Sequence, residues 1–138
     1  MKRILYPTAD GGVAVLIPTE EYLLDHTMEE LAAKDVPQGV AYQIVDVADI
    51  PVDRTFRNAL CLHDGLLHHD QDKCCAITKD RLRAERKPLL EAQDVLFMRA
   101  TEAGADTTAI AVEKQRLRDV TKLVTPELTL EEMKGLHP

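Results

Sequence analysis

The sequence contains no tryptophan, only five other aromatic side chains and only three cysteines among its 138 residues. Any hydrophobic core must therefore be mostly aliphatic, and a chain of this length can bury such a core without metal or disulfide staples. No apolar run approaches the roughly 20 residues that a transmembrane helix needs. Pro7 interrupts the N-terminal stretch before the apolar core of a signal peptide could form. We expect a protein that folds in the cytoplasm.

Basic residues are also in deficit, with 17 lysines and arginines against 24 acidic residues and a net charge of −7. This balance argues against a general nucleic-acid binder, which needs a basic surface to displace phosphate counterions. The charge is unevenly distributed: up to Asp72 there are five basic and thirteen acidic residues, whereas residues 74–123 hold ten and eight. The sequence therefore predicts an acidic module followed by a module of mixed charge.

Familiar catalytic motifs are missing as well. The sequence has no phosphate-binding loop, no G-x-S-x-G and no H-E-x-x-H. The paired carboxylates at Glu20, Glu21, Glu29 and Glu30 are typical of the first turn of a helix, where the helix dipole favours negative charge. We expect no enzymatic activity, no catalytic residues and no cofactor.

The N-terminal segment, residues 1–58, is predicted to be a small α+β module. Two apolar runs flank Asp10-Gly11-Gly12, a pattern that predicts a β-hairpin. Thr27 and Glu30 have the spacing of a capping box and predict a helix that ends before Pro37. Residues 40–47 carry apolar side chains on both faces, which predicts a strand in the centre of a sheet.

Residues 61–75, "CLHDGLLHHDQDKCC", contain all three cysteines and three of the five histidines. Zinc sites usually present two ligands two to five residues apart on one knuckle, and the adjacent pairs here fit that spacing poorly. The turn signal at Asp64-Gly65 instead predicts a short β-hairpin over residues 59–72, followed by a helix that begins near Cys74 with Asp70 or Asp72 as its cap. We therefore expect no metal; if one binds, the first ligands to test are Cys61, His63, His69 and Cys74.

Residues 73–125 change to a helical period. Apolar side chains form one stripe up to about Gly104 and a second stripe from Ile110 to Val124, which predicts an antiparallel helical hairpin. Pro88 predicts either a kink or a restart of the first helix. The lysines and arginines of these helices predict a solvated, salt-bridged face between the two helices; the alternative is a surface that binds an acidic partner. Residues 126–138 form a tail with one or two more helical turns.

These elements together predict an α+β fold with a hairpin, helix and strand module, a second short hairpin and a C-terminal helical hairpin. An isolated helical hairpin leaves part of its apolar stripe uncovered, so we expect contacts with another protein or another copy of the chain. The residues proposed for this interaction surface are Leu82, Leu89, Leu96, Phe97, Ile110 and Leu117.

Three strings, "EELAAKDVPQGVAYQIVDVADIPVDRTFRNA", "DRLRAERKPLLEAQDVLFMRATEAG" and "KQRLRDVT", with a closing "TPEL", give the chain a resemblance to a known group. The chain resembles small proteins encoded beside tail-fibre genes in tailed bacteriophages and prophages, from about Glu29 to Leu128. One departure is Leu60, where the group tends to have tryptophan.

The resemblance implies a non-enzymatic accessory or assembly protein that contacts tail fibre or baseplate components, in the cytoplasm of a bacterial host or in the virion tail. It implies no active site. The alternative is a stand-alone bacterial adaptor or regulatory module whose acidic first half binds a basic partner. Neither alternative involves nucleic acid or a membrane. We expect a homo-oligomer or a stable hetero-complex assembled through the long helices.

Overall fold

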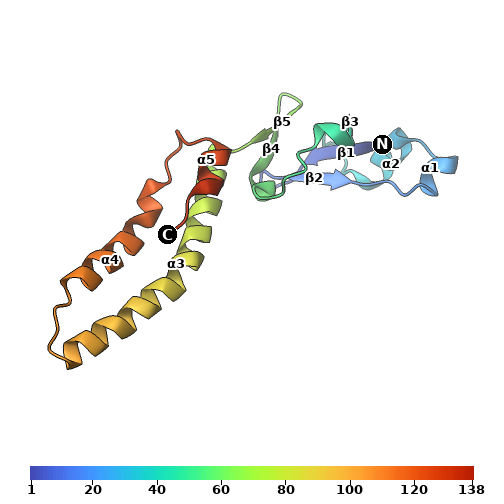
Figure 1. The fold of residues 1–138 in the computed structure, drawn as a ribbon. Coiled ribbons are helices and arrows are strands. Elements are labelled where there is room, and N and C mark those ends of the chain that lie inside the picture. Colours follow the sequence, from blue (N-terminus) through green and yellow to red (C-terminus); the bar gives the residue numbers. More distant parts are fainter. The chain divides into compact units, whose positions relative to one another are not determined.

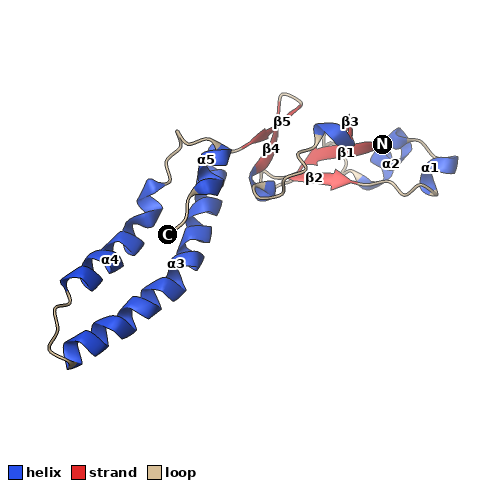
Figure 2. Cartoon of the chain, viewed as in Figure 1, coloured by secondary structure: helices blue, strands red, loops and turns tan.

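The computed structural model describes all 138 residues, which divide into two compact units, Met1–Asp70 and Gln71–Pro138 (Figure 1). We call these the N-terminal unit and the helical unit. All strands lie in the N-terminal unit, whereas the regular structure of the helical unit consists only of helices (Figure 2). The predicted α+β class is therefore confirmed. The second hairpin, which we predicted as a separate connector, belongs to the N-terminal unit.

The N-terminal unit is built on an antiparallel sheet in the order β2-β1-β3, with β1 Lys2–Pro7, β2 Val13–Leu16 and β3 Gln43–Asp46. The predicted first hairpin is confirmed. Its turn is closed by a hydrogen bond from Gly11 N to Thr8 O at 3.0 Å, and Gly11 adopts φ of 78°, a conformation that glycine adopts without strain.

The prediction that the third strand is central is wrong, because β3 is an edge strand and β1 lies between its two neighbours. Both faces of β3 are nevertheless partly covered, and its residues Gln43, Ile44 and Val45 are half-buried. Apolar residues on two faces require layers above and below the sheet. They do not require a strand on each side, which is why the pattern was misleading.

One face of the sheet is covered by short helices, α1 Tyr22–Asp25 and α2 Met28–Asp35. The predicted capping box at the start of α2 is confirmed: Thr27 Oγ1 accepts from Glu30 N at 3.2 Å, and the Glu30 carboxylate accepts from Thr27 N at 2.9 Å. Ile4 of β1 packs with Leu31 and Ala32 of α2 in a small aliphatic core.

Strand alternation places Leu5, which is also buried, on the opposite face from Ile4. The chain after β3 forms two short 3-10 helices, η1 Val47–Asp49 and η2 Arg57–Ala59, and then the hairpin of β4 Leu60–His63 and β5 Leu66–His69. Strand β4 lies against β1 and β2. Phe56 and Ala59 are buried where this segment packs.

The β4–β5 hairpin has the predicted turn. Asp64 and Gly65 both have positive φ, 48° and 78°, which is the backbone of the tight hairpin turns that match strand twist. A Cβ atom at position 65 would lie 2.2 Å from Nε2 of Gln43, so a larger residue there would also require the Gln43 side chain to move.

The helical unit consists of α3 Gln71–Glu102, α4 Thr108–Asp119, a 3-10 turn η3 Val120–Leu123, and α5 Leu130–Gly135. Helix α3 begins at Gln71, three residues before the predicted start. Pro88 lies inside it and does not divide it; the axis of α3 bends between its green first half and its yellow second half, so the kink is observed and the restart is not (Figure 1).

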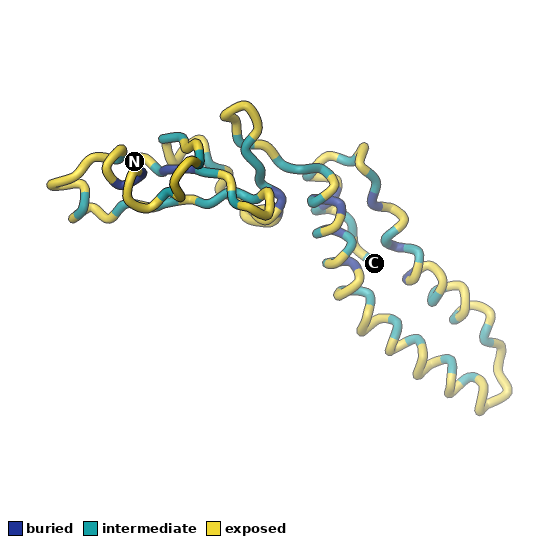
Figure 3. Tube along the Cα trace, turned by 180° about the vertical axis from the view of Figure 1, so that it is seen from behind, coloured by how far each residue is buried: buried dark blue, intermediate teal, exposed yellow.

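The core of the helical unit is confined to one end. Cys74, Thr78, Leu82, Leu117 and Met133 are each at most 1% exposed, and they come from α3, α4 and α5. The segment predicted as a tail thus includes the expected helical turns, and Met133 on α5 is part of this core. No residue from 83 to 116 is buried, and Figure 3 shows the dark blue segments of this unit only near the α5 end.

Candidate interaction surface

The six residues predicted for the interaction surface fall into two groups. Leu82 and Leu117 are fully buried in the core beside α5 and are not accessible to a partner. Leu89 and Leu96 are 44% and 46% exposed, and Phe97 and Ile110 are half-buried. The six residues belong to two helices: four lie on α3, and Ile110 and Leu117 lie on α4. Only those in the part of the hairpin nearest the loop between α3 and α4, which we call the distal part, are open to solvent.

Three more apolar side chains are exposed on the same part of the hairpin: Val95 (43%), Met98 (59%) and Val112 (65%). Sequence reasoning missed them because they lie off the helical stripe. The sequence pattern could have indicated them, since apolar residues on both sides of a helix predict that protein covers both sides. Successive residues of a helix are about 100° apart, so Leu89 and Leu96 lie on one side of α3 and Met98 on the opposite side. We call Leu89, Val95, Leu96, Met98 and Val112, which lie on more than one side of the hairpin, the distal apolar surface.

One polar contact joins the two long helices in this distal part. Lys114 Nζ of α4 lies 2.6 Å from Asp94 Oδ1 of α3 and 4.9 Å from the centre of the Phe97 ring. The Lys114 side chain is only 16% exposed, so both the ion pair and the cation–π contact are partly shielded from water. This contact orients α4 against α3 without closing an apolar core between them.

Two arginines of α3 hold the ends of the other helices. Arg86 donates to the carbonyl of Arg118 at 2.6 Å, near the end of α4. Arg81 donates to the carbonyls of Met133 and Leu136 at 2.9 and 2.8 Å, at the end of α5. Carbonyl groups at a helix C-terminus have no partner within the helix and carry partial negative charge, so a guanidinium group there both satisfies and neutralises them.

Arg81 also donates to Glu85 at 2.8 Å, and His137 lies 3.2 Å from the same carboxylate. The hydrogen bond from Arg81 holds the pKa of Glu85 below its ordinary value, with a smaller contribution from His137. Further pairs join Arg83 to Asp80 and Arg116 to Glu113. Salt bridges are therefore present as predicted, but most lie within one helix, and the pair of Lys114 and Asp94 joins α3 to α4. Arg81 and Arg86 additionally cap helices.

The cysteine- and histidine-rich segment has no shared centre. Cys61 is half-buried in β4, whereas Cys74 and Cys75 are buried in α3 of the other unit. His63 is exposed at the hairpin turn, 3.1 Å from the carboxylate of the adjacent Asp64. No three or more histidine, cysteine, aspartate or glutamate side chains form a group that could hold a metal ion.

Comparisons with known proteins add no relative: no family model, no curated protein and no solved structure matches the chain. None of the helices combines the length and apolar composition needed to cross a bilayer.

Proposed function

We propose that this chain is a non-enzymatic tail-associated accessory or assembly protein of a bacteriophage or prophage, acting through the distal part of its helical hairpin. The observation that carries the proposal is the combination of a long stretch without a buried residue, 83–116, with the five exposed side chains of the distal apolar surface. Helices with so little packing are marginal in water, so a partner that covers them would also stabilise them.

The free energy available from burying the distal apolar surface favours a partner that makes further contacts beyond it. Complete burial of a valine, leucine or methionine side chain contributes about 1.5–3 kcal/mol. The five side chains are roughly half exposed and lie on more than one side of the hairpin, so a partner that covers all five contributes about 4–8 kcal/mol. Association costs about 4–15 kcal/mol in lost freedom of motion. The distal apolar surface alone is therefore close to break-even. A second copy, which contributes the same surface again, or a fibre segment that reaches additional contacts provides the remainder.

The nature of the partner is drawn from the resemblance, whose second string covers most of α3, including Leu89, Leu96 and Met98. Tail fibre or baseplate proteins are accordingly the proposed partners, in the bacterial cytoplasm during assembly or in the virion tail. The acidic excess of the N-terminal unit supports the alternative, an adaptor for a basic partner. Gene neighbourhood separates the two, because tail genes beside the gene for this chain favour the first.

The experiment is co-expression with the neighbouring fibre protein, followed by size-exclusion chromatography with light scattering. The test variant is Leu96→Gln with Met98→Gln. The control is Leu24→Gln with Leu123→Gln, which makes a comparable polar change at sites that are 81% and 56% exposed. We expect the test variant to lose the complex, or the homo-oligomer formed in the absence of fibre, and the control to keep it. A compact monomer that ignores the fibre protein at every concentration would refute the proposal.

A further inference from the structure

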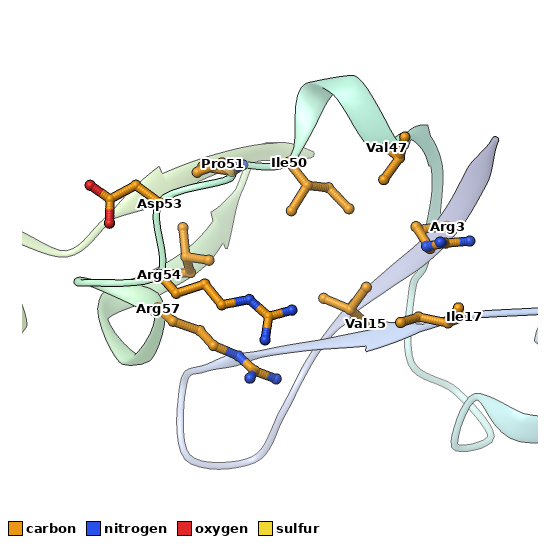
Figure 4. Close-up of a pocket in the computed structure, with 10 residues that line it drawn as sticks. Arg3, Val15, Ile17, Val47, Ile50, Pro51, Asp53, Arg54 and Arg57 are labelled. Carbon is orange, nitrogen blue, oxygen red and sulfur yellow. The ribbon is translucent and has the colours of Figure 1, made fainter.

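The N-terminal unit contains a cavity of about 240 Å³ on the sheet face opposite α2 (Figure 4). Its floor includes Val15 and Ile17 at the end of β2. Val47, Ile50 and Pro51 approach from the segment that follows β3 (Figure 4). These walls are apolar and partly open: Val15, Ile17 and Val47 are 37%, 63% and 42% exposed. Three arginines complete the lining, Arg3 from β1 and Arg54 and Arg57 from the loop before β4.

The local sequence "DRTFR" explains why two of these arginines lie together. Asp53 Oδ1 accepts from Thr55 N at 2.9 Å and from Thr55 Oγ1 at 2.6 Å, which fixes the start of a turn. Arg57 N then donates to Arg54 O at 3.1 Å and closes it. Phe56 is only 3% exposed and anchors the turn in the unit. Residues 54 and 57 therefore project from one side of a rigid turn, with exposed side chains.

Figure 4 shows Arg54 and Arg57 extending side by side with their guanidinium groups turned toward the interior of the cavity. The carboxylate of Asp53, the one acidic residue of the lining, points away from it (Figure 4). The guanidinium group of Arg3 contacts the Lys2 carbonyl and the Met1 sulfur. The donors of Arg54 and Arg57 face the cavity, where a ligand can reach them (Figure 4).

The concentration of positive charge is unusual for this unit. Its five lysines and arginines are Lys2, Arg3, Lys34, Arg54 and Arg57. Three of the five line one cavity, in a unit where acidic residues predominate. Charge complementarity therefore points to an anionic group, and the planar forks of two guanidinium groups match a carboxylate or a phosphate. Because the rest of the unit is acidic, a long polyanion such as a nucleic acid would be repelled outside the cavity.

The size and walls of the cavity restrict the class of possible ligands further. Pockets for drug-sized ligands span about 300–1,000 Å³. A cavity below that range suits one or two side chains. Apolar walls beside cationic groups fit an aliphatic side chain next to a carboxylate. We propose that this cavity binds an acidic peptide segment of a partner protein, in which an aspartate or glutamate that pairs with Arg54 and Arg57 is adjacent to an aliphatic residue.

This inference does not depend on the proposed function, because the cavity includes no residue of the helical unit. It is tested by selecting short random peptides, acetylated and amidated at their ends, on the immobilised full-length protein. The affinities of the enriched peptides are then measured by fluorescence anisotropy. The test variant is Arg54→Gln with Arg57→Gln. Lys2→Gln with Lys34→Gln is a matched control, since it removes the same charge from the same unit outside the cavity.

We expect enriched peptides that carry a carboxylate beside leucine, isoleucine or valine. Their affinity should fall about tenfold or more in the test variant, because charge-assisted hydrogen bonds are lost. It should change by less than about twofold in the control, whose lysines contribute only screened long-range charge. Circular dichroism checks that both variants fold. If Arg54→Gln with Arg57→Gln does not, Arg54→Lys with Arg57→Lys keeps the charge, loses the planar fork and should still weaken binding.

Three outcomes would overturn the inference. Selection that enriches no peptide, or peptides without carboxylates, would exclude an acidic segment as the ligand. Equal losses of peptide affinity in the test variant and in the control would mean that binding depends on the net charge of the unit and not on the cavity. Binding of an oligo(dT) strand that depends on Arg54 and Arg57 and exceeds that of every peptide would assign the cavity to nucleic acid.

Discussion

The helical unit should depend on Met133, because this side chain of α5 completes a core that otherwise comes only from α3, α4 and the turn after them. Met133 is 0% exposed, whereas Met98 on α3 is 59% exposed. Met133→Ala and Met98→Ala therefore make the same chemical change inside and outside the core of one unit. Truncation of a buried methionine to alanine costs about 2–5 kcal/mol, from lost burial and from the cavity left behind.

The helix preference of alanine offsets only a few tenths of a kcal/mol of this cost, and it acts equally at both sites. Met98 is exposed in the single chain, so Met98→Ala should change stability by less than about 0.5 kcal/mol when unfolding is measured at a concentration too low for association. A domain of this size has a urea dependence of about 1–3 kcal/mol per molar. With a slope of about 2 kcal/mol per molar, the unfolding midpoint of Met133→Ala should then fall by about 1–2.5 M relative to Met98→Ala. Since the free energy of unfolding of small domains is only about 5–15 kcal/mol, Met133→Ala should remove a large fraction of the stability of the helical unit.

Two optical signals distinguish the units. Most helical residues belong to the helical unit, so far-ultraviolet circular dichroism reports mainly on it. The three tyrosines, Tyr6, Tyr22 and Tyr42, all lie in the N-terminal unit, so tyrosine fluorescence reports on that unit. We expect the dichroism midpoint to shift in Met133→Ala. Equal dichroism midpoints for the two variants would refute the reasoning, because they would mean that α5 contributes nothing to the core.

Three further predictions follow from the helices and from residues 61–75. Arg81 holds the pKa of Glu85 below its ordinary value of 4.5, so the stabilisation is present above that value and is lost as the pH falls through the lower folded pKa. Glu85→Gln should therefore reduce the loss of stability between about pH 5 and pH 3, and Glu91→Gln, an exposed change on the same helix, should not; identical pH profiles would exclude this coupling. Pro88→Ala should raise the dichroism midpoint, because proline inside a helix costs up to about 3 kcal/mol, and a lowered midpoint would mean that the bend is required for packing. The purified protein should contain no stoichiometric zinc, and a chelator should leave its melting temperature unchanged. One equivalent of zinc, lost together with the fold, would contradict the hairpin interpretation of residues 61–75.

Local signals predicted the fold well. The turn glycines at positions 11 and 65 and the capping box of Thr27 and Glu30 act over a few residues, so the sequence displays them directly. The position of β3 depends on which strand it pairs with, and no pattern within β3 encodes that choice. The early start of α3 at Gln71 was missed because the helical period becomes evident only later, after a segment that is rich in histidine and aspartate.

The candidate sites were predictable only in part. The stripe through Leu89 and Leu96 was found, but whether each residue is buried depends on where α5 packs, and periodicity does not contain that information. The arginine-lined cavity was missed entirely. Arg54 and Arg57 flanking an apolar Phe56 gave a local signal, since a turn places them on one side. Arg3 is distant in sequence and joins them only through the pairing of the sheet and the packing of the later segment.

The order in which the core residues appear in the sequence has a consequence for synthesis on the ribosome. Leu82 is made early in the helical unit, and Met133 follows it some fifty residues later. At 5–20 residues per second, this delay is about 3–10 s. During that time α3 can already form, but the side chains that will meet α5 remain uncovered. The nascent helical unit therefore exposes apolar side chains for seconds, an interval in which a chaperone can bind them.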